Sequence, residues 1–259
     1  SQASYDEMNR RLEGFAGEMA ALDKKTGRTV WKTDRTAIWN DLDPDGKPHM
    51  EGDFRKAYST PLVADVRGNP QMFSAASKAV YSYDPRTGRE LWKVRHGAFS
   101  TAVRPLCFNG LAIMSTGAEL MGIRTDGLGD VTDTHVAWKV GQAVSRMPSP
   151  ILVDGLVYMV STDGTVSCIE AATGKQVWIE RIRSNYYASP IYADGRVYFF
   201  SNTGKTTVLK AGRAFEVLAT NMLGDGFMAS PAVSGRALIL RSKTSLYRVE
   251  ETAGSAATR

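Results

Sequence analysis

Short apolar runs separated by turn residues recur along this chain. Two of them are nearly identical in pattern: residues 149–160 read SPILVDGLVYMV, and residues 189–200 read SPIYADGRVYFF. Each predicts a short strand opened by proline, an Asp-Gly hairpin turn and a second apolar strand. Related starts lie at positions 61, 102, 150, 190 and 231. The pattern therefore predicts antiparallel hairpins repeated at an interval of about forty residues.

A second motif also recurs, with an acidic residue, Thr-Gly and tryptophan at constant spacing. It occupies residues 21–31, 82–92 and 168–178. The glycine supplies the positive φ that a tight hairpin requires, so each copy predicts two antiparallel strands. The acidic residue can accept hydrogen bonds from the amides of its own turn. The residues concerned are Gly27, Gly88 and Gly174 in the turns, preceded by Asp23, Asp84 and Glu170.

The tryptophans of this motif lie in the outgoing strand. A side chain of that size buries about 150–250 Å² of surface between neighbouring layers. We therefore interpret Trp31, Trp92 and Trp178 as packing residues between sheets rather than as platforms for a ligand.

Together the two patterns predict four short antiparallel strands per repeat, which is typical of a β-propeller blade. The chain is expected to be all-β, with one domain over residues 1–259, about five to six blade units, an irregular segment 1–16 and a tail 251–259. The first unit has only its third and fourth strands, and the last has three. We therefore expect the C-terminal part of a seven- or eight-bladed ring; a complete six-unit ring with one irregular blade is the alternative.

The Ala-x-Asp-x-x-Thr-Gly-x-x-x-Trp element resembles the tryptophan-docking motif of the pyrroloquinoline-quinone-like propellers. That superfamily includes quinoprotein alcohol dehydrogenases and the lipoprotein subunit of the bacterial outer-membrane β-barrel assembly machinery. The resemblance spans about residues 17–250 and implies that each tryptophan stacks on the turn of a neighbouring blade. It also implies a periplasmic or extracellular location. Two units depart from the pattern: one inserts residues 126–135 before Trp138, and the other has residues 214–218 in place of the tryptophan-bearing strand.

Composition agrees with a globular domain. The chain is 43% hydrophobic and 23% charged, and no apolar run approaches the roughly 18 residues of a transmembrane helix. The net charge is +5, but the basic residues are scattered over turns and strand ends. The sequence shows neither a helix that would fit a DNA groove nor a ladder of aromatic residues, so we expect no nucleic-acid partner. Residues 1–11 contain no charged start followed by an apolar stretch, and so no signal peptide is expected there.

No catalytic set emerges from the sequence. The histidines His49, His96 and His135 lack metal-ligand spacing, and no nucleophile elbow or nucleotide loop is present. A quinoprotein dehydrogenase would carry adjacent cysteines, whereas Cys107 and Cys168 lie 61 positions apart. We therefore expect no pyrroloquinoline quinone, no enzyme activity and two free cysteines in interior strands.

One acidic cluster suggests a metal. Asp41, Asp43 and Asp45, followed by Gly46, reproduce the start of a calcium loop because alternate carboxylates converge and glycine permits the turn. Position 12 of that loop is Gly52, with no ligand side chain. A weak calcium site and a solvated acidic turn are the two interpretations, and the second is favoured.

Two function classes remain. The first is a non-catalytic scaffold whose rim loops, including the inserted segments 34–57 and 124–137, bind a protein or a cell-envelope polymer. The second is an oxidoreductase or carbohydrate-binding module that uses a central channel, with Tyr186 and Tyr187 near the ligand. The absence of a converging acid and base favours the scaffold.

Overall fold

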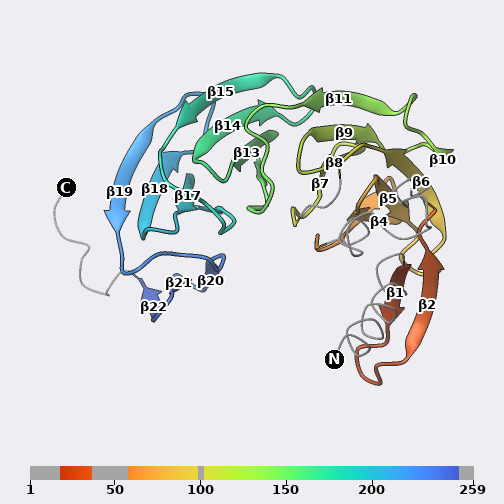
Figure 1. Cartoon of the computed structure of the whole chain (residues 1–259), viewed down its shortest axis with the longest axis horizontal. Helices are drawn as coiled ribbons and strands as arrows, with labels where there is room; N and C mark the ends of the chain where they lie inside the picture. Colours follow the sequence, from red (N-terminus) through yellow and green to blue (C-terminus); the bar gives the residue numbers. More distant parts are fainter. Residues whose placement is uncertain (1–17, 37–57, 99–101, 251–259) are drawn as a thin grey trace, which may run out of the picture. The chain divides into compact units, whose positions relative to one another are not determined.

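The computed structural model describes residues 18–36, 58–98 and 102–250, and within them the regular structure is entirely strand (Figure 1). The contacts divide the chain into two compact units. Unit 1 comprises residues 1–142 with 172–174, and unit 2 comprises residues 143–171 with 175–259. Each unit is built from successive sheets, in which all pairs but β10–β6 are antiparallel.

Unit 1 contains three sheets. The first pairs β1 with β2, the second has the order β10-β6-β5-β4-β3, and the third has the order β11-β9-β8-β7. Their strands are β1 (Glu18–Leu22), β2 (Thr29–Asp34), β3 (Leu62–Val66), β4 (Asn69–Ala75), β5 (Ala79–Tyr83), β6 (Glu90–Arg95), β7 (Leu106–Phe108), β8 (Leu111–Ser115), β9 (Leu120–Arg124), β10 (Gly129–Asp130) and β11 (Val136–Val140).

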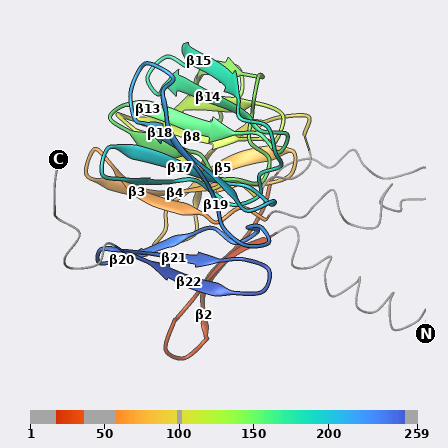
Figure 2. The same cartoon turned by 90° about the vertical axis from the view of Figure 1, so that its left-hand side faces the viewer.

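Unit 2 also contains three sheets, with the orders β12-β13-β14-β15, β16-β17-β18-β19 and β20-β21-β22. In Figure 2 the last three strands lie side by side. The strands are β12 (Ile151–Val153), β13 (Leu156–Val160), β14 (Thr165–Glu170), β15 (Gln176–Arg181), β16 (Ile191–Ala193), β17 (Arg196–Phe200), β18 (Lys205–Lys210), β19 (Val217–Met222), β20 (Ala232–Ser234), β21 (Ala237–Arg241) and β22 (Leu246–Val249).

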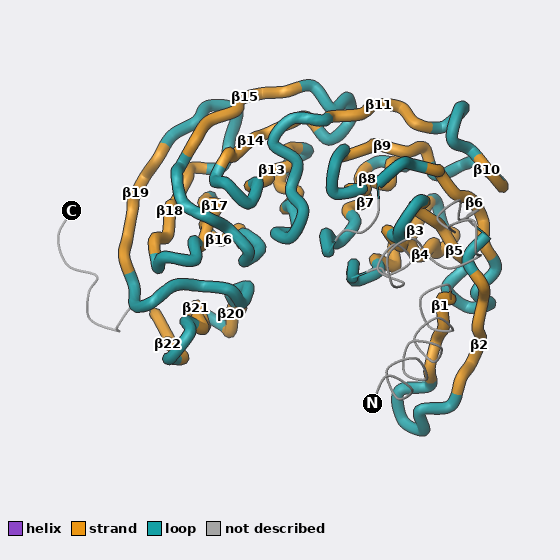
Figure 3. The backbone as a smooth tube through the Cα atoms, viewed as in Figure 1, coloured by secondary structure: helices purple, strands orange, loops and turns teal. Residues whose placement is uncertain are grey.

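The Asp-Gly hairpins form as predicted. Asp154 and Gly155 have φ of 49° and 76°, and Asp194 and Gly195 have φ of 50° and 72°. Two consecutive positive φ values are the signature of the type I′ turn, whose twist matches that of the flanking strands. Tight turns therefore join the two strands of each of these hairpins, as the tube of Figure 3 shows for β12–β13 and β16–β17.

The Thr-Gly turns also form as predicted. Gly27, Gly88 and Gly174 have φ of 72°, 74° and 68°. The carboxylate of Asp23 accepts hydrogen bonds from the backbone N–H of Lys25 at 3.0 Å and of Thr26 at 2.8 Å. That of Asp84 accepts one from the Arg86 N–H at 2.8 Å. Glu170 instead pairs with Arg213 of the following sheet, with the guanidinium 2.5 Å from the carboxylate.

A β-bulge recurs at one place in the motif. The register shifts directly after Ala21, Ser82 and Cys168, and each of these residues pairs with the tryptophan of the next strand. The extra residue re-aims the strand just before its turn. The same shift follows Val208, although its partner strand β19 carries Ala219 where the other repeats have tryptophan.

Apolar cores lie between consecutive sheets within each unit. In unit 2 one cluster joins residues of the β12–β15 sheet to residues of the β16–β19 sheet, among them Trp178, Phe199 and Leu209. In unit 1 a second cluster joins Phe73 and Trp92 to Met114 and other residues of the third sheet. Strands β5 and β13 are buried at every position, as strands packed on both faces must be.

The inserted segment 124–137, which the sequence predicts as a rim loop, contains a short strand. Its residues Gly129–Asp130 form β10, which pairs in parallel with β6 of the preceding sheet. The Val131 N–H also donates to the Lys93 carbonyl at 2.9 Å. The segment therefore covers the outer edge of that sheet, because β6 would otherwise present unpaired backbone groups to water.

Candidate functional site

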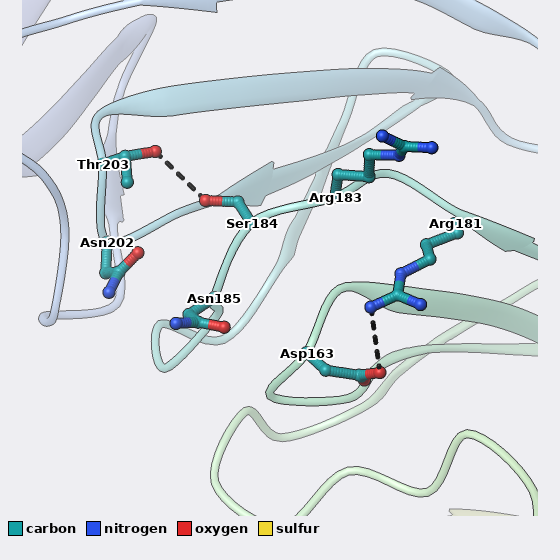
Figure 4. A pocket seen from close by; sticks show the side chains of 7 residues that line it. All are labelled: Asp163, Arg181, Arg183, Ser184, Asn185, Asn202 and Thr203. Carbon is teal, nitrogen blue, oxygen red and sulfur yellow. Dashed lines mark hydrogen bonds and ion pairs between the residues drawn. The ribbon is translucent and has the colours of Figure 1, made fainter.

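A polar pocket opens at one edge of unit 2 and has a volume of about 580 Å³. In an antiparallel sheet alternate connections lie at the same edge. The β13–β14 turn, the β15–β16 connection and the β17–β18 turn thus meet there, as Figure 4 shows. The lining residues are Asp163, Arg181, Arg183, Ser184, Asn185, Asn202 and Thr203.

Backbone hydrogen bonds hold these three segments together. The Ile182 N–H donates to the Gly164 carbonyl at 2.9 Å, and the Tyr186 N–H donates to the Thr162 carbonyl at 3.0 Å. Gly164 is required for this approach, because a Cβ there would lie 2.6 Å from the Ser184 carbonyl oxygen. The Asn202 N–H donates to the Asn185 carbonyl at 2.9 Å, so the connection is tied to both turns.

The connection turns sharply at Arg183, whose φ is 42°. Ala143 and Gly224 stand at the same place in the flanking repeats, six residues before the serine of each Ser-Pro pair, with φ of 52° and 59°. The left-handed backbone conformation therefore recurs at this position in each repeat, although the residue type differs. The half-buried Lys205 stabilises this corner, because its ammonium donates to the carbonyl oxygens of Ile182 and Arg183.

The pocket carries a positive electrostatic excess. Two guanidinium groups line it, those of Arg181 and Arg183, against one carboxylate, that of Asp163. Asp163 lies 3.7 Å from Arg181, as drawn in Figure 4. A hydrogen bond from the Ser161 hydroxyl, assisted by Arg181, holds the pKa of the Asp163 carboxyl below its usual value. Charged arginines and neutral amides suit the recognition of carboxylates and peptide groups.

The seven described residues that line the pocket include no pair of carboxyl groups for acid-base chemistry. Asp163 is the one carboxylate that lines it, whereas glycoside hydrolysis uses two carboxyl groups on opposite sides of the bond. Within residues 18–36, 58–98 and 102–250 no group of three histidine, cysteine or acidic side chains is placed to hold a metal ion. The predicted calcium ligands Asp41, Asp43 and Asp45 lie outside the described residues.

The cysteines belong to different sheets, as the sequence predicts, but Cys168 alone lies in an interior strand, because β7, which carries Cys107, is an edge strand. Cys107 is half-buried on β7, and Cys168 is buried on β14. Burial raises the pKa of Cys107 and raises that of Cys168 to about 12. Since the thiolate is the reactive form, neither thiol is prepared for nucleophilic chemistry.

Trp31 lies over the turn of the next sheet of unit 1. Its indole N–H donates to the Pro85 carbonyl at 3.0 Å, and a Cβ at Gly88 would stand 2.4 Å from its ring. The Trp178 indole donates to the Gly212 carbonyl of the following sheet at 3.3 Å, within unit 2. Gly27 has the same turn conformation, yet no atom of the described residues lies within 4 Å of a Cβ built there.

Trp92 makes a different polar contact. Its ring is fully buried, and its indole N–H donates to the Gln71 side-chain oxygen of its own sheet at 3.2 Å. Gln71 also accepts from the Ser82 hydroxyl at 2.9 Å and donates to the Thr125 carbonyl at 3.0 Å. Sequence reasoning missed Gln71, because nothing in the repeat marks that position as polar and buried.

Trp138 belongs to a unit that the sequence marks as irregular, although its ring lies over Gly174. A Cβ at Gly174 would lie 2.7 Å from the Trp138 ring, and one at Gly122 would lie 2.2 Å from it. Gly122 pairs with Trp138 at the place where the other repeats have Ala21, Ser82 or Cys168. That alignment is the signal that could have identified the fourth tryptophan.

The proposed ligand contact Tyr186 is wrong. Its side chain is 0% exposed, because its bridge to Ser201 turns it into the core between two sheets. Tyr187 points to the opposite side of the segment and is partly exposed.

Within the described residues, no helix is long and apolar enough to cross a membrane.

Comparison with solved structures establishes the fold. BamB from Moraxella catarrhalis is 15% identical with a TM-score of 0.58, over 86% of this chain and 60% of that one. The computationally designed Ika8 protein is also 15% identical, with a TM-score of 0.62, over 91% of this chain and 65% of that one. The predicted all-β propeller of four-stranded antiparallel blades is confirmed, and the chain spans about three fifths of the length of these structures.

Sequence comparison adds the family. No curated protein matches the chain. The family model described as outer membrane protein assembly factor BamB matches residues 76–216, more than half of the 259 residues. The chain therefore belongs to the family of the outer membrane protein assembly factor BamB.

Proposed function

We propose that this protein is a non-catalytic propeller scaffold that binds another protein in the periplasm or at the cell surface. The observation that carries the proposal is the pocket of unit 2: a rigid rim site with two arginines, two amides and a single carboxylate. Such groups recognise a protein surface, while the lining lacks a paired acid and base. Membership in a family named for outer-membrane protein assembly supports this location and role.

The loops that line the pocket suit binding because hydrogen bonds within the protein preorganise them. Backbone hydrogen bonds hold the connection 182–186, and the Lys205 ammonium anchors its corner. Binding to a preorganised site loses less conformational entropy than binding to a mobile loop. Arg181 and Arg183 nevertheless remain exposed at the surface.

A carbohydrate-binding role is the alternative. The Asn185 and Asn202 amides and the Asp163 carboxylate are groups that also bind sugar hydroxyls. No aromatic ring lines the pocket beside them, so a stacking surface for a sugar is missing among its seven residues. Protein binding is therefore the better interpretation.

The proposal is tested by affinity capture from the native envelope fraction with the full-length protein, followed by mass spectrometry. Wild type and an Arg181→Ala/Arg183→Ala variant are compared, with Arg196→Ala, an exposed arginine on β17, as the matched control. We expect a protein partner that the double variant loses and the control retains. Recovery of only a glycan, or of no partner by wild type, would refute the scaffold function.

A further inference from the structure

Three repeats of unit 2 each expose a methionine or tyrosine side chain at one equivalent position. Met147, Tyr187 and Met228 each lie four residues before the first strand of a sheet, namely β12, β16 and β20. Met147 is 50% exposed and Met228 is 54% exposed, while Tyr187 is partly exposed. In unit 1, Tyr58 stands four residues before β3 and is 61% exposed.

Buried neighbours turn two of these side chains, those of Tyr187 and Met228, toward the surface. Tyr186 and Ala188 flank Tyr187 and are 0% and 1% exposed. Phe227, before Met228, is 1% exposed and packs edge-on against Phe200 at 5.6 Å between ring centroids. In an extended segment alternate residues point to opposite sides, so burial of the flanking residues turns the central one outward.

Consecutive segments are also bonded to each other. The Ser149 N–H donates to the Ser189 hydroxyl at 2.9 Å, and the Ser189 N–H donates to the Ser230 hydroxyl at 3.0 Å. Each serine lies two residues after one of the exposed side chains. Met147, Tyr187 and Met228 therefore project from adjacent segments of unit 2, and we call them the apolar row.

Isolated exposed apolar residues need no explanation, but repetition at one structural position does. Methionine and tyrosine are enriched in protein interfaces, methionine because its flexible thioether adapts to different surfaces. The apolar row and the polar pocket share one connection, since Arg183 and Asn185, which line the pocket, precede Tyr187 by four and two residues. The positive charge of that pocket favours a partner segment that carries carboxylates beside its apolar side chains.

We infer that the apolar row and the polar pocket together dock an extended segment of a partner protein that carries alternating apolar side chains and carboxylates. This inference rests on the scaffold function proposed above and adds the chemistry of the partner. The apolar side chains would cover the row, and a carboxylate would pair with Arg183. Asp225 lies in the next connection, where hydrogen bonds from Ser242 and Thr244 lower the pKa of its carboxyl. Its negative charge would repel a carboxylate of the partner, so we place the partner's carboxylate at Arg183.

The test uses fluorescein-labelled peptides of about ten residues, long enough to span roughly 33 Å when extended. One alternates leucine with aspartate, the second replaces aspartate by lysine, and the third replaces leucine by serine. Binding to the full chain is measured by fluorescence anisotropy. We expect the leucine-aspartate peptide to bind at least about tenfold more tightly than either of the others, and more weakly as salt is added.

Variants then locate the site. Met147→Gln/Met228→Gln is expected to weaken binding of the leucine-aspartate peptide about tenfold, and Arg183→Ala about fivefold. Met222→Gln is the matched control, because Met222 is a 67% exposed methionine on β19 outside the row. All of these residues are exposed, so unchanged circular dichroism melting would show that the variants fold.

Three outcomes would overturn the inference: equal binding of the lysine peptide, no effect of the double methionine variant, or no binding of any peptide at about 1 mM. Envelope capture separates this failure from failure of the scaffold function. If Met147→Gln/Met228→Gln recovers the wild-type partner in full, the row is not the docking site, although the scaffold function stands. If wild type recovers no protein partner, the scaffold function itself is wrong.

Discussion

Tryptophan docking over a glycine turn can be measured because the chain contains a matched pair of turns. Gly27 and Gly88 have φ of 72° and 74° in the same motif. Within the part of the chain that the structure describes, a Cβ at Gly27 meets no atom within 4 Å, whereas one at Gly88 would lie 2.4 Å from Cε3 of Trp31 and 2.8 Å from the Thr33 hydroxyl. Gly27→Ala therefore reports backbone strain alone, and Gly88→Ala reports strain together with loss of docking.

The expected magnitudes follow from these contacts. Alanine in the left-handed region costs about 1–2 kcal/mol in either variant. At Gly88 the indole must also move, which adds roughly 1–3 kcal/mol for overpacking and weakens the bond of Trp31 to the Pro85 carbonyl, worth about 1 kcal/mol. We expect Gly88→Ala to lower the free energy of unfolding by about 2–4 kcal/mol more than Gly27→Ala.

Urea unfolding followed by far-ultraviolet circular dichroism measures both variants, with the m-value checked for a single cooperative transition. Repeating Gly88→Ala in a Trp31→Ala background completes a double-mutant cycle. In that background the cost of Gly88→Ala should fall to within about 1 kcal/mol of the Gly27→Ala cost. Equal costs for the two glycines in the wild-type background would refute the reasoning.

Three further predictions address burial, pH and metal binding. Gln71→Leu should destabilise the protein by about 2–4 kcal/mol in urea unfolding, because the Trp92 indole N–H is left buried without an acceptor, while the exposed Gln176→Leu should change stability little. Burial lowers the pKa of His96 from 6.5 to about 4, so as the pH falls the unfolded chain binds a proton before the folded protein does. The free energy of unfolding should therefore be at its full value above about pH 6.5 and fall by about 3 kcal/mol as the pH drops to 4. His96→Leu should flatten that dependence; an unchanged slope would disprove the assignment. Calorimetric titration should show calcium binding no tighter than about millimolar at Asp41, Asp43 and Asp45, and a strong heat that Asp43→Asn abolishes would contradict this.

The sequence by itself determined the local structure of this protein. The Asp-Gly hairpins, the Thr-Gly turns and the roughly forty-residue repeat depend on φ preferences and side-chain hydrogen bonds within a few residues. Such features can be identified without knowing what packs against them. The blade architecture followed, because four short antiparallel strands per repeat leave few other folds.

The tertiary structure alone decided which side chains are available at the surface. Strands buried on both faces carry continuous apolar runs, so the pattern cannot show which neighbour covers each face. Tyr186 and Tyr187 are identical in sequence terms, yet one is in the core and the other is exposed. The pocket likewise joins segments up to 40 residues apart, from Asp163 to Thr203, through backbone hydrogen bonds between repeats. Contacts across that separation depend on how one sheet packs on the next, and no local preference encodes them.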